Sequence, residues 1–185
     1  MDEAQHKTLL TFARETIRAR LTGGEPPPPP AVEIEAARFG GAFVTLHNGR
    51  MLRGCIGRFG ASASLAETVR EMALAALDDP RFRSHPVTAA ELPELTIEIS
   101  VLSPMRRTAD PLSLELGVHG ILIRKGDQSG CFLPQVATEQ KWSKEQFLSH
   151  CCAGKAGLPP DAWKGPDAEV FLFSAEVFGE AEFSK

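Results

Sequence analysis

The chain has 185 residues, a formal net charge of -4 and 43% hydrophobic residues. This size and apolar content can fill a core, while the slightly acidic balance gives no overall field that would favour nucleic acid or an anionic membrane. No apolar run approaches the roughly 18 residues that span a bilayer, and the acidic, polar start is unlike a signal peptide. The cysteines form neither a secreted framework nor a CxxC pair, so we expect reduced thiols in a cytoplasmic protein.

The first segments predict a helix followed by a stiff connector. Leu10, Ala13 and Ile17 recur at three- and four-residue intervals, which is typical of an amphipathic helix. The prolines Pro26 to Pro30 favour an extended polyproline connector over a ligand for an SH3-type domain. We therefore divide a single domain, residues 1–185, into a helix at 1–22, a proline-rich spacer at 23–31 and a main body at 32–180.

The stretch AFVTLHNGRMLRGCIG predicts a β-hairpin. The Asn-Gly dipeptide at 48–49 stands between two apolar runs and suits a two-residue type I′ turn. Such a turn would place Val44 opposite Arg53 and Ala42 opposite Cys55. Because Arg53 and Cys55 are two residues apart on a strand, we expect their side chains on the same face.

The later elements do not alternate regularly as in a wound βαβ fold. The predicted elements are a helix capped by Ser64 and Glu67, a strand at 95–103, a hairpin turning near Gly126 to Gly130, a helix from Ser143 to about Gly154, and a late strand in AEVFLFSAEVFGE. Two local hairpins favour an α+β fold with antiparallel sheet.

Several stretches together resemble the AMMECR domain family, called AmmeMemoRadiSam system protein A in prokaryotes. They are, in order, LRGCIG (52–57), DPRF (79–82), IEISVLS (97–103), GVHGILI (117–123), LPQVATEQKW (133–142), FLSHCCAGKAGL (147–158) and VFGE (177–180). The resemblance implies an α+β domain with two sub-domains around antiparallel β-sheet and flanking helices. It implies no established reaction, but an association with a Memo-like protein and a radical SAM (S-adenosylmethionine) enzyme. The proline run departs from the family pattern, so its role is not carried over.

The LRGCIG motif contains the first candidate for chemistry. Cys55 would be nucleophilic as a thiolate, and the guanidinium of Arg53 on the same face would favour that form. Gly54 and Gly57 flank the thiol and would let a substrate approach the backbone. The structural alternative is equally concrete, since cysteine is also a small core residue and glycines mark bulges and bends.

Other candidate residues are charged or polar side chains along the strands and helices. On an apolar face Arg53 needs a partner or a polar cavity, so it either forms an ion pair with Glu98 or binds an anionic small molecule. Glu98 or His119 would then handle a proton. The resemblance carries over His119, Gln135 and Lys155 as site residues, with hydrogen bonding within the fold as the alternative for each.

Two functions from different classes follow from these residues. The first is an enzyme that acts on a small molecule at the LRGCIG motif, with Cys55 as nucleophile. The second is a non-catalytic adaptor or carrier that recruits partner proteins, in which the same motif fixes a tight backbone corner. Nucleic-acid binding is disfavoured by the acidic balance, and the sequence holds no signature for a metal or a cofactor. A reactive Cys55 would distinguish the enzyme from the adaptor.

Overall fold

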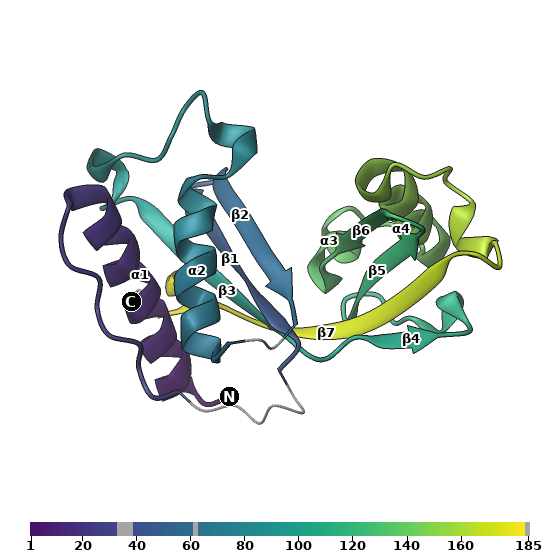
Figure 1. Cartoon of the computed structure of the whole chain (residues 1–185), viewed down its shortest axis with the longest axis horizontal. Helices are drawn as coiled ribbons and strands as arrows, with labels where there is room; N and C mark the ends of the chain where they lie inside the picture. The colour runs from purple at the N-terminus through teal and green to yellow at the C-terminus, as the bar shows by residue number, and fades with distance from the viewer. Residues whose placement is uncertain (33–38, 61–62, 184–185) are drawn as a thin grey trace. The chain divides into compact units, whose positions relative to one another are not determined.

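The chain forms two compact units. The computed structural model describes residues 1–32, 39–60 and 63–183, so the start of the predicted main body, at 33–38, lies outside the described residues. Unit 1 contains residues 1–102 and 176–185, and unit 2 contains residues 103–175. The last strand, β7 (Glu169–Gly179), begins in unit 2 and ends in unit 1 (Figure 1).

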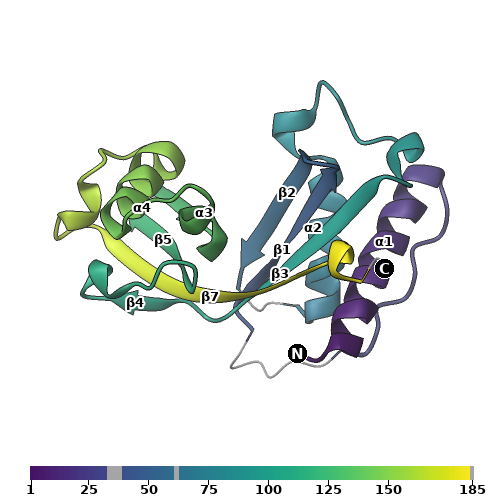
Figure 2. The same cartoon turned by 180° about the vertical axis from the view of Figure 1, so that it is seen from behind.

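Unit 1 is an antiparallel sheet with two helices on one face. Strands β1 (Gly41–Asn48), β2 (Met51–Phe59) and β3 (Leu95–Leu102) pair in the order β2-β1-β3. Helices α1 (Glu3–Thr22) and α2 (Leu65–Leu77) lie side by side on the sheet, as Figures 1 and 2 show from opposite sides. Strand β2 is therefore the edge of this sheet.

Local sequence signals explain both helices of unit 1. Asp2 caps the start of α1, and Gly23 ends it with a φ of 75°. Ser64 and Glu67 form the predicted capping box of α2. The proline run that follows α1 is hydrogen-bonded to α2, because Arg70 donates a bond of 2.7 Å to the carbonyl oxygen of Pro27. The buried faces of the two helices and of the sheet form one apolar core.

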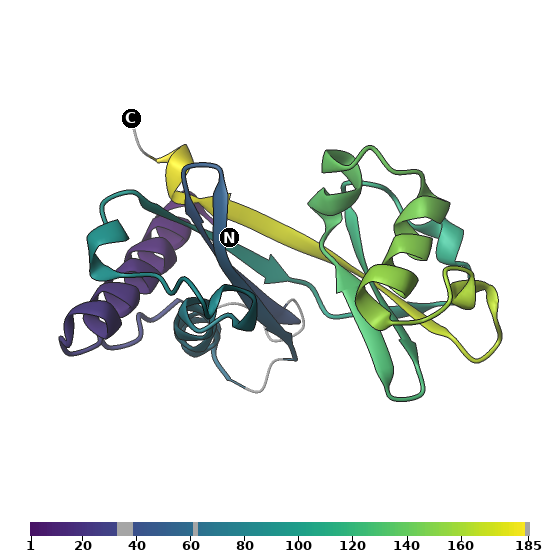
Figure 3. The same cartoon turned by 90° about the horizontal axis from the view of Figure 1, so that it is seen from above.

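Unit 2 has its own sheet and its own core. Strands β5 (His119–Lys125) and β6 (Gln128–Phe132) form the predicted second hairpin, and β7 pairs with both β5 and the short β4 (Arg106–Thr108). Helices α3 (Pro134–Glu139) and α4 (Lys144–Cys151) pack near this sheet (Figure 3). The sequence did not predict α3, which spans only 6 residues.

A π-helical turn, Cys152–Ala156, extends α4 beyond the predicted end at Gly154. It stops at Gly157, which has a φ of 68°. Gly130 of β6 allows this turn to pack closely, because a Cβ there would lie 2.4 Å from the backbone nitrogen of Ala156. Such turns concentrate at functional sites, which makes this segment of interest.

The predicted register of the first hairpin is wrong. Asn48 remains in the strand and pairs with Met51, so the turn consists of residues 49–50, and only Gly49 takes a positive φ. A bulge beside Leu46 then shifts the pairing further, so that Cys55 lies opposite Thr45 instead of Ala42. At this bulge β2 has one more residue than β1. As a result Gly54 lies against α2, and the side chain of Cys55 points to the face of the sheet away from that helix.

The part of the chain that the structure describes contains no helix long and apolar enough to cross a membrane.

Candidate functional site

Three polar side chains form a row across the strands of unit 1. Thr45 of β1 lies opposite Cys55 of β2 on one side and opposite Glu98 of β3 on the other. The neighbouring row, which includes Gly54, faces α2, so the polar row lies on the face of the sheet away from that helix. The hydroxyl of Thr45 donates a hydrogen bond of 3.2 Å to Sγ of Cys55.

The strand spacing sets the distance between the two ends of the row. The backbone N–H and C=O of Cys55 bind groups outside the sheet, so Thr45 and Cys55 form a non-hydrogen-bonded pair. Cα atoms in such a pair are about 4.5 Å apart, and those of the hydrogen-bonded pair Thr45–Glu98 about 5.5 Å apart, which separates Cys55 from Glu98 by roughly 10 Å. Thr45 lies between the thiol and the carboxylate, so the two do not contact each other directly.

The DPRF motif covers the outer edge of the LRGCIG strand. Asp79, whose side chain is 1% exposed, accepts hydrogen bonds from the backbone N–H of Cys55 at 3.0 Å and from Arg81. These donors lower the pKa of Asp79 to about 2, with the Arg81 side chain as the largest cause. Arg81 in turn donates to the carbonyl oxygen of Cys55 at 3.1 Å. Two motifs far apart in the sequence therefore form one site.

Arg81 is the cation beside the thiol. Its pKa is raised, mainly by the hydrogen bond with Asp79. Asp79 fixes its Nε and Nη2 atoms, whereas Nη1 has no partner among the described residues. Its side chain is 50% exposed, so part of it is accessible to a ligand.

Arg53 has a different partner from the one that we predicted. Its guanidinium pairs with Glu91 through Nε (2.8 Å) and Nη2 (3.0 Å), not with Glu98, and Nη2 also donates to the carbonyl oxygens of His85 and Pro86. The Arg53 side chain lowers the pKa of Glu91 to about 2. Arg53 thus holds the loop that follows DPRF against the edge strand. Its side chain is only 12% exposed, and a ligand-binding role for it stays a prediction.

The two glycines of LRGCIG are required by packing. A Cβ on Gly54 would lie 2.0 Å from the carbonyl oxygen of Ala76 in α2, and one on Gly57 would lie 2.1 Å from the ring of Phe43. Real Cβ atoms do not approach so closely. Helix α2 and the Phe43 ring therefore both depend on bare backbone in β2, and a substrate-binding role for either glycine stays a prediction.

The remaining predicted residues belong to unit 2. His119 closes a turn, because its Nδ1 accepts the backbone N–H of Glu115 at 3.0 Å. Gln135 has a buried Oε1 with no hydrogen-bond partner among the described residues. Lys155 lies in the π-helical turn with its Nζ 5.5 Å from the centre of the Phe132 ring. Their roles as site residues stay predictions.

The other cysteines differ from Cys55 in burial. Cys151 and Cys152 are buried in the core of unit 2, and burial raises the pKa of both thiols. Cys131 is partly exposed, like Cys55, so its thiol is a suitable reference for the reactivity of Cys55. Within residues 1–32, 39–60 and 63–183, no three His, Cys, Asp or Glu side chains are grouped so that they could hold a metal ion.

Comparison with known proteins places this chain in a family. The AMMECR1 family model matches residues 10–178. A protein from Methanosarcina mazei is 38% identical over 193 residues, covering 98% of this chain and 94% of that protein. A protein from Thermococcus kodakarensis is 43% identical over 164 residues, covering 83% and 78%. The crystal structure of an uncharacterized protein, PH0010, from Pyrococcus horikoshii matches with a TM-score of 0.86 and 36% identity, covering 97% of this chain and 93% of that one.

The helices and antiparallel strands define an α+β protein, as the sequence predicted, and the fold matches the Pyrococcus horikoshii protein throughout. The chain belongs to the AMMECR1 family.

Proposed function

We propose that this protein is an enzyme that acts on a small anionic molecule through the thiol of Cys55. The proposal rests on the groups that surround the Sγ atom of Cys55. The Thr45 hydroxyl donates to it, and the guanidinium of Arg81 is bonded to the backbone of the same residue. A donated hydrogen bond and a nearby cation both stabilise a thiolate over a thiol. Neither contact is needed to bury a structural cysteine.

The roles of the charged residues follow from their contacts. Arg81 binds the anionic group of the substrate through Nη1, the role that the sequence alone suggested for Arg53. The sulfur of Cys55 then forms a C–S bond with a carbonyl carbon of the substrate, while the π bond of that carbonyl breaks and its electron pair moves to the oxygen. Glu98 is too far from the thiol for direct contact. It takes the proton of the Cys55 thiol through the substrate or a bridging water. Arg53 and Asp79 are positioning residues, because they hold the DPRF loop against β2.

The wider setting is part of the same proposal. The family resemblance suggests that the reaction takes place beside a Memo-like protein and a radical SAM enzyme. None of the contacts described above bears on those partners, so the proposal for Cys55 stands or falls independently of them.

Alkylation by neutral iodoacetamide at pH 7, followed for each cysteine-containing peptide by mass spectrometry, tests the proposal. We expect Cys55 to react at least tenfold faster than Cys131, because the Thr45 hydroxyl and the Arg81 guanidinium both favour a thiolate at Cys55. Thr45→Val keeps the β-branched shape but removes the donor, and should slow alkylation of Cys55 several-fold. Thr96→Val, a change of the same type on β3, is the matched control.

An unreactive Cys55 in the folded protein would contradict the proposal, as would equal rates in the Thr45→Val and Thr96→Val variants. In the first case the thiol is structural, and in the second the hydroxyl does not activate it. Cys151 and Cys152 provide a check on folding, because they become accessible only if unit 2 opens.

A further inference from the structure

A groove along helix α1 lies outside the site described above. It encloses about 710 Å³ and lies entirely within unit 1. One wall is a stripe of α1 that includes Lys7, Leu10 and Arg18. The opposite wall is formed by Leu92 and Pro93, which precede β3. We call this feature the α1 groove.

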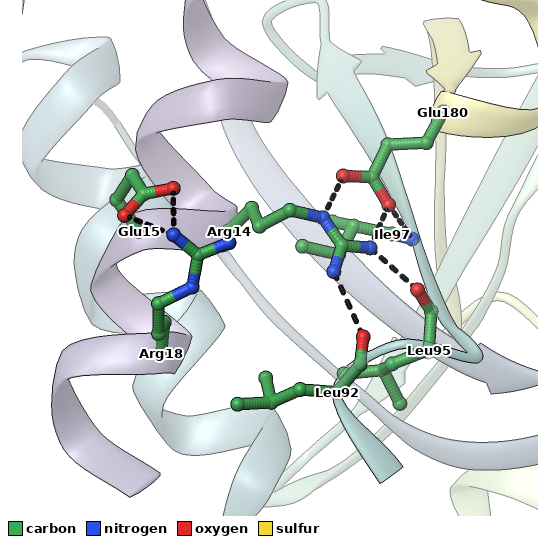
Figure 4. A network of polar contacts seen from close by, with 7 residues as sticks. All are labelled: Arg14, Glu15, Arg18, Leu92, Leu95, Ile97 and Glu180. Atoms are coloured by element: carbon green, nitrogen blue, oxygen red, sulfur yellow. Dashed lines mark hydrogen bonds and ion pairs between the residues drawn. The ribbon is translucent and has the colours of Figure 1, made fainter. Parts of the chain in front are cut away.

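A central ion pair fixes the shape of the α1 groove. Arg14 reaches across it and pairs with Glu180 through Nε and Nη2, and its other bonds go to the carbonyl oxygens of Leu92 (3.1 Å) and Leu95 (Figure 4). Glu180 also accepts the backbone N–H of Ile97 at 2.9 Å. All three nitrogen atoms of the Arg14 guanidinium thus bond to the protein, so we assign Arg14 a supporting role in the groove.

The two ends of the α1 groove are positively charged. Lys7 and Arg18 line it, whereas their carboxylate partners Glu3 and Glu15 do not. Both ion pairs are exposed, with 54% of the Lys7 side chain and 53% of the Arg18 side chain accessible, and pairs of this kind contribute only about 0–1 kcal/mol. A ligand carboxylate can therefore replace either partner at little cost.

The length and the walls of the groove define what would fit. Lys7 and Arg18 are 11 positions apart on the helix, which places them roughly 16 Å from each other. About five residues of extended chain span that distance. Between the two cations the walls carry the apolar side chains of Leu10, Leu92 and Pro93 beside the Arg14–Glu180 pair. A small-molecule site buries most of the surface of its ligand. Because both cations here are half exposed, the groove is better suited to a peptide segment that keeps one side in water.

We propose that the α1 groove binds an extended acidic peptide segment of a partner protein, in which two carboxylates about five residues apart flank apolar side chains. This surface would recruit a partner without taking part in chemistry at Cys55, and the proposal does not rest on the function proposed for that residue. Its support is charge complementarity with Lys7 and Arg18, together with the apolar side chains that line the groove between them.

The test is fluorescence anisotropy with the full chain and a labelled hexapeptide, ELFLLE. We expect it to bind at least tenfold more tightly than the charge-reversed KLFLLK. Replacing both Lys7 and Arg18 with glutamate should weaken binding of ELFLLE at least tenfold. Arg20→Glu is the matched control, because this exposed arginine is on the same helix but does not line the groove, and it should change affinity less than twofold. The Lys7→Gln/Arg18→Gln variant repeats the test without adding repulsion from Glu3 and Glu15.

Three results would overturn the proposal. Equal binding of the two peptides would show that charge does not select the ligand. An equal loss of affinity in Arg20→Glu and in the double variant would place the binding outside the groove. Saturable binding of decanoate without binding of ELFLLE would identify the occupant as a free amphiphile instead of a protein segment.

Discussion

Replacing Gly54 with alanine is expected to destabilise unit 1 by about 3 kcal/mol, the upper part of the range for overpacked cores. The new Cβ would lie 2.0 Å from the carbonyl oxygen and 2.9 Å from the carbonyl carbon of Ala76. These are backbone atoms of α2, so no side chain can rotate away. The helix must move off β2, and the apolar contacts between the two would be lost.

Urea denaturation monitored by circular dichroism measures this effect. Gly154→Ala is the matched control, because a Cβ at Gly154 meets no heavy atom within 4 Å and this glycine does not have a positive φ. We expect Gly154→Ala to stay within about 0.5 kcal/mol of the wild type. A Gly54→Ala variant with wild-type stability would show that α2 does not pack on this strand as described.

The second large effect is expected for Asp79. Asp79→Ala removes the acceptor of the Cys55 N–H and leaves Arg81 without its ion pair. Breaking a buried pair typically costs 3–5 kcal/mol, and because Arg81 is half exposed we expect the lower end, about 3 kcal/mol. The variant should also slow alkylation of Cys55, because Arg81 is no longer held beside it.

The contribution of Asp79 should also depend on pH. Its pKa falls from an ordinary value of 3.8 to about 2 in the folded protein, so its stabilising effect is fully present above about pH 4 and is lost as the pH falls through about 2. The difference in stability between the wild type and Asp79→Asn should therefore shrink over this interval. A difference that stayed constant between pH 5 and pH 2 would show that the charge of Asp79 is not what its neighbours bind.

Local signals predicted the elements of the fold well. The capping boxes at Ser64 and Ser143 and the two hairpins act over a few residues, and a sequence contains all that they need. The register of the first hairpin depends instead on packing. Gly54 packs against Ala76, some twenty residues further along the chain, and a bulge in the hairpin allows this contact. The Asn-Gly dipeptide at the turn does not indicate the bulge.

The candidate site was predictable in its centre but not in its contacts. Cys55 stands out as a residue type, yet the sequence suggested Glu98 as the ion-pair partner of Arg53, and only the folded chain shows that it is Glu91. Asp79 precedes a proline, which signals a turn. However, Asp79 also accepts a hydrogen bond from the backbone N–H of Cys55 in the edge strand. No spacing in the sequence indicates this long-range contact.

The measurement that tests the central claim most directly compares two alkylating reagents at Cys55. Iodoacetate carries the negative charge that Arg81 would bind, whereas iodoacetamide is neutral. We predict that the ratio of the iodoacetate rate to the iodoacetamide rate is several-fold higher at Cys55 than at Cys131, that Arg81→Gln abolishes this preference, and that the exposed neighbour Arg83→Gln leaves it unchanged. A ratio at Cys55 no higher than at Cys131 would contradict the claim that this site selects an anion.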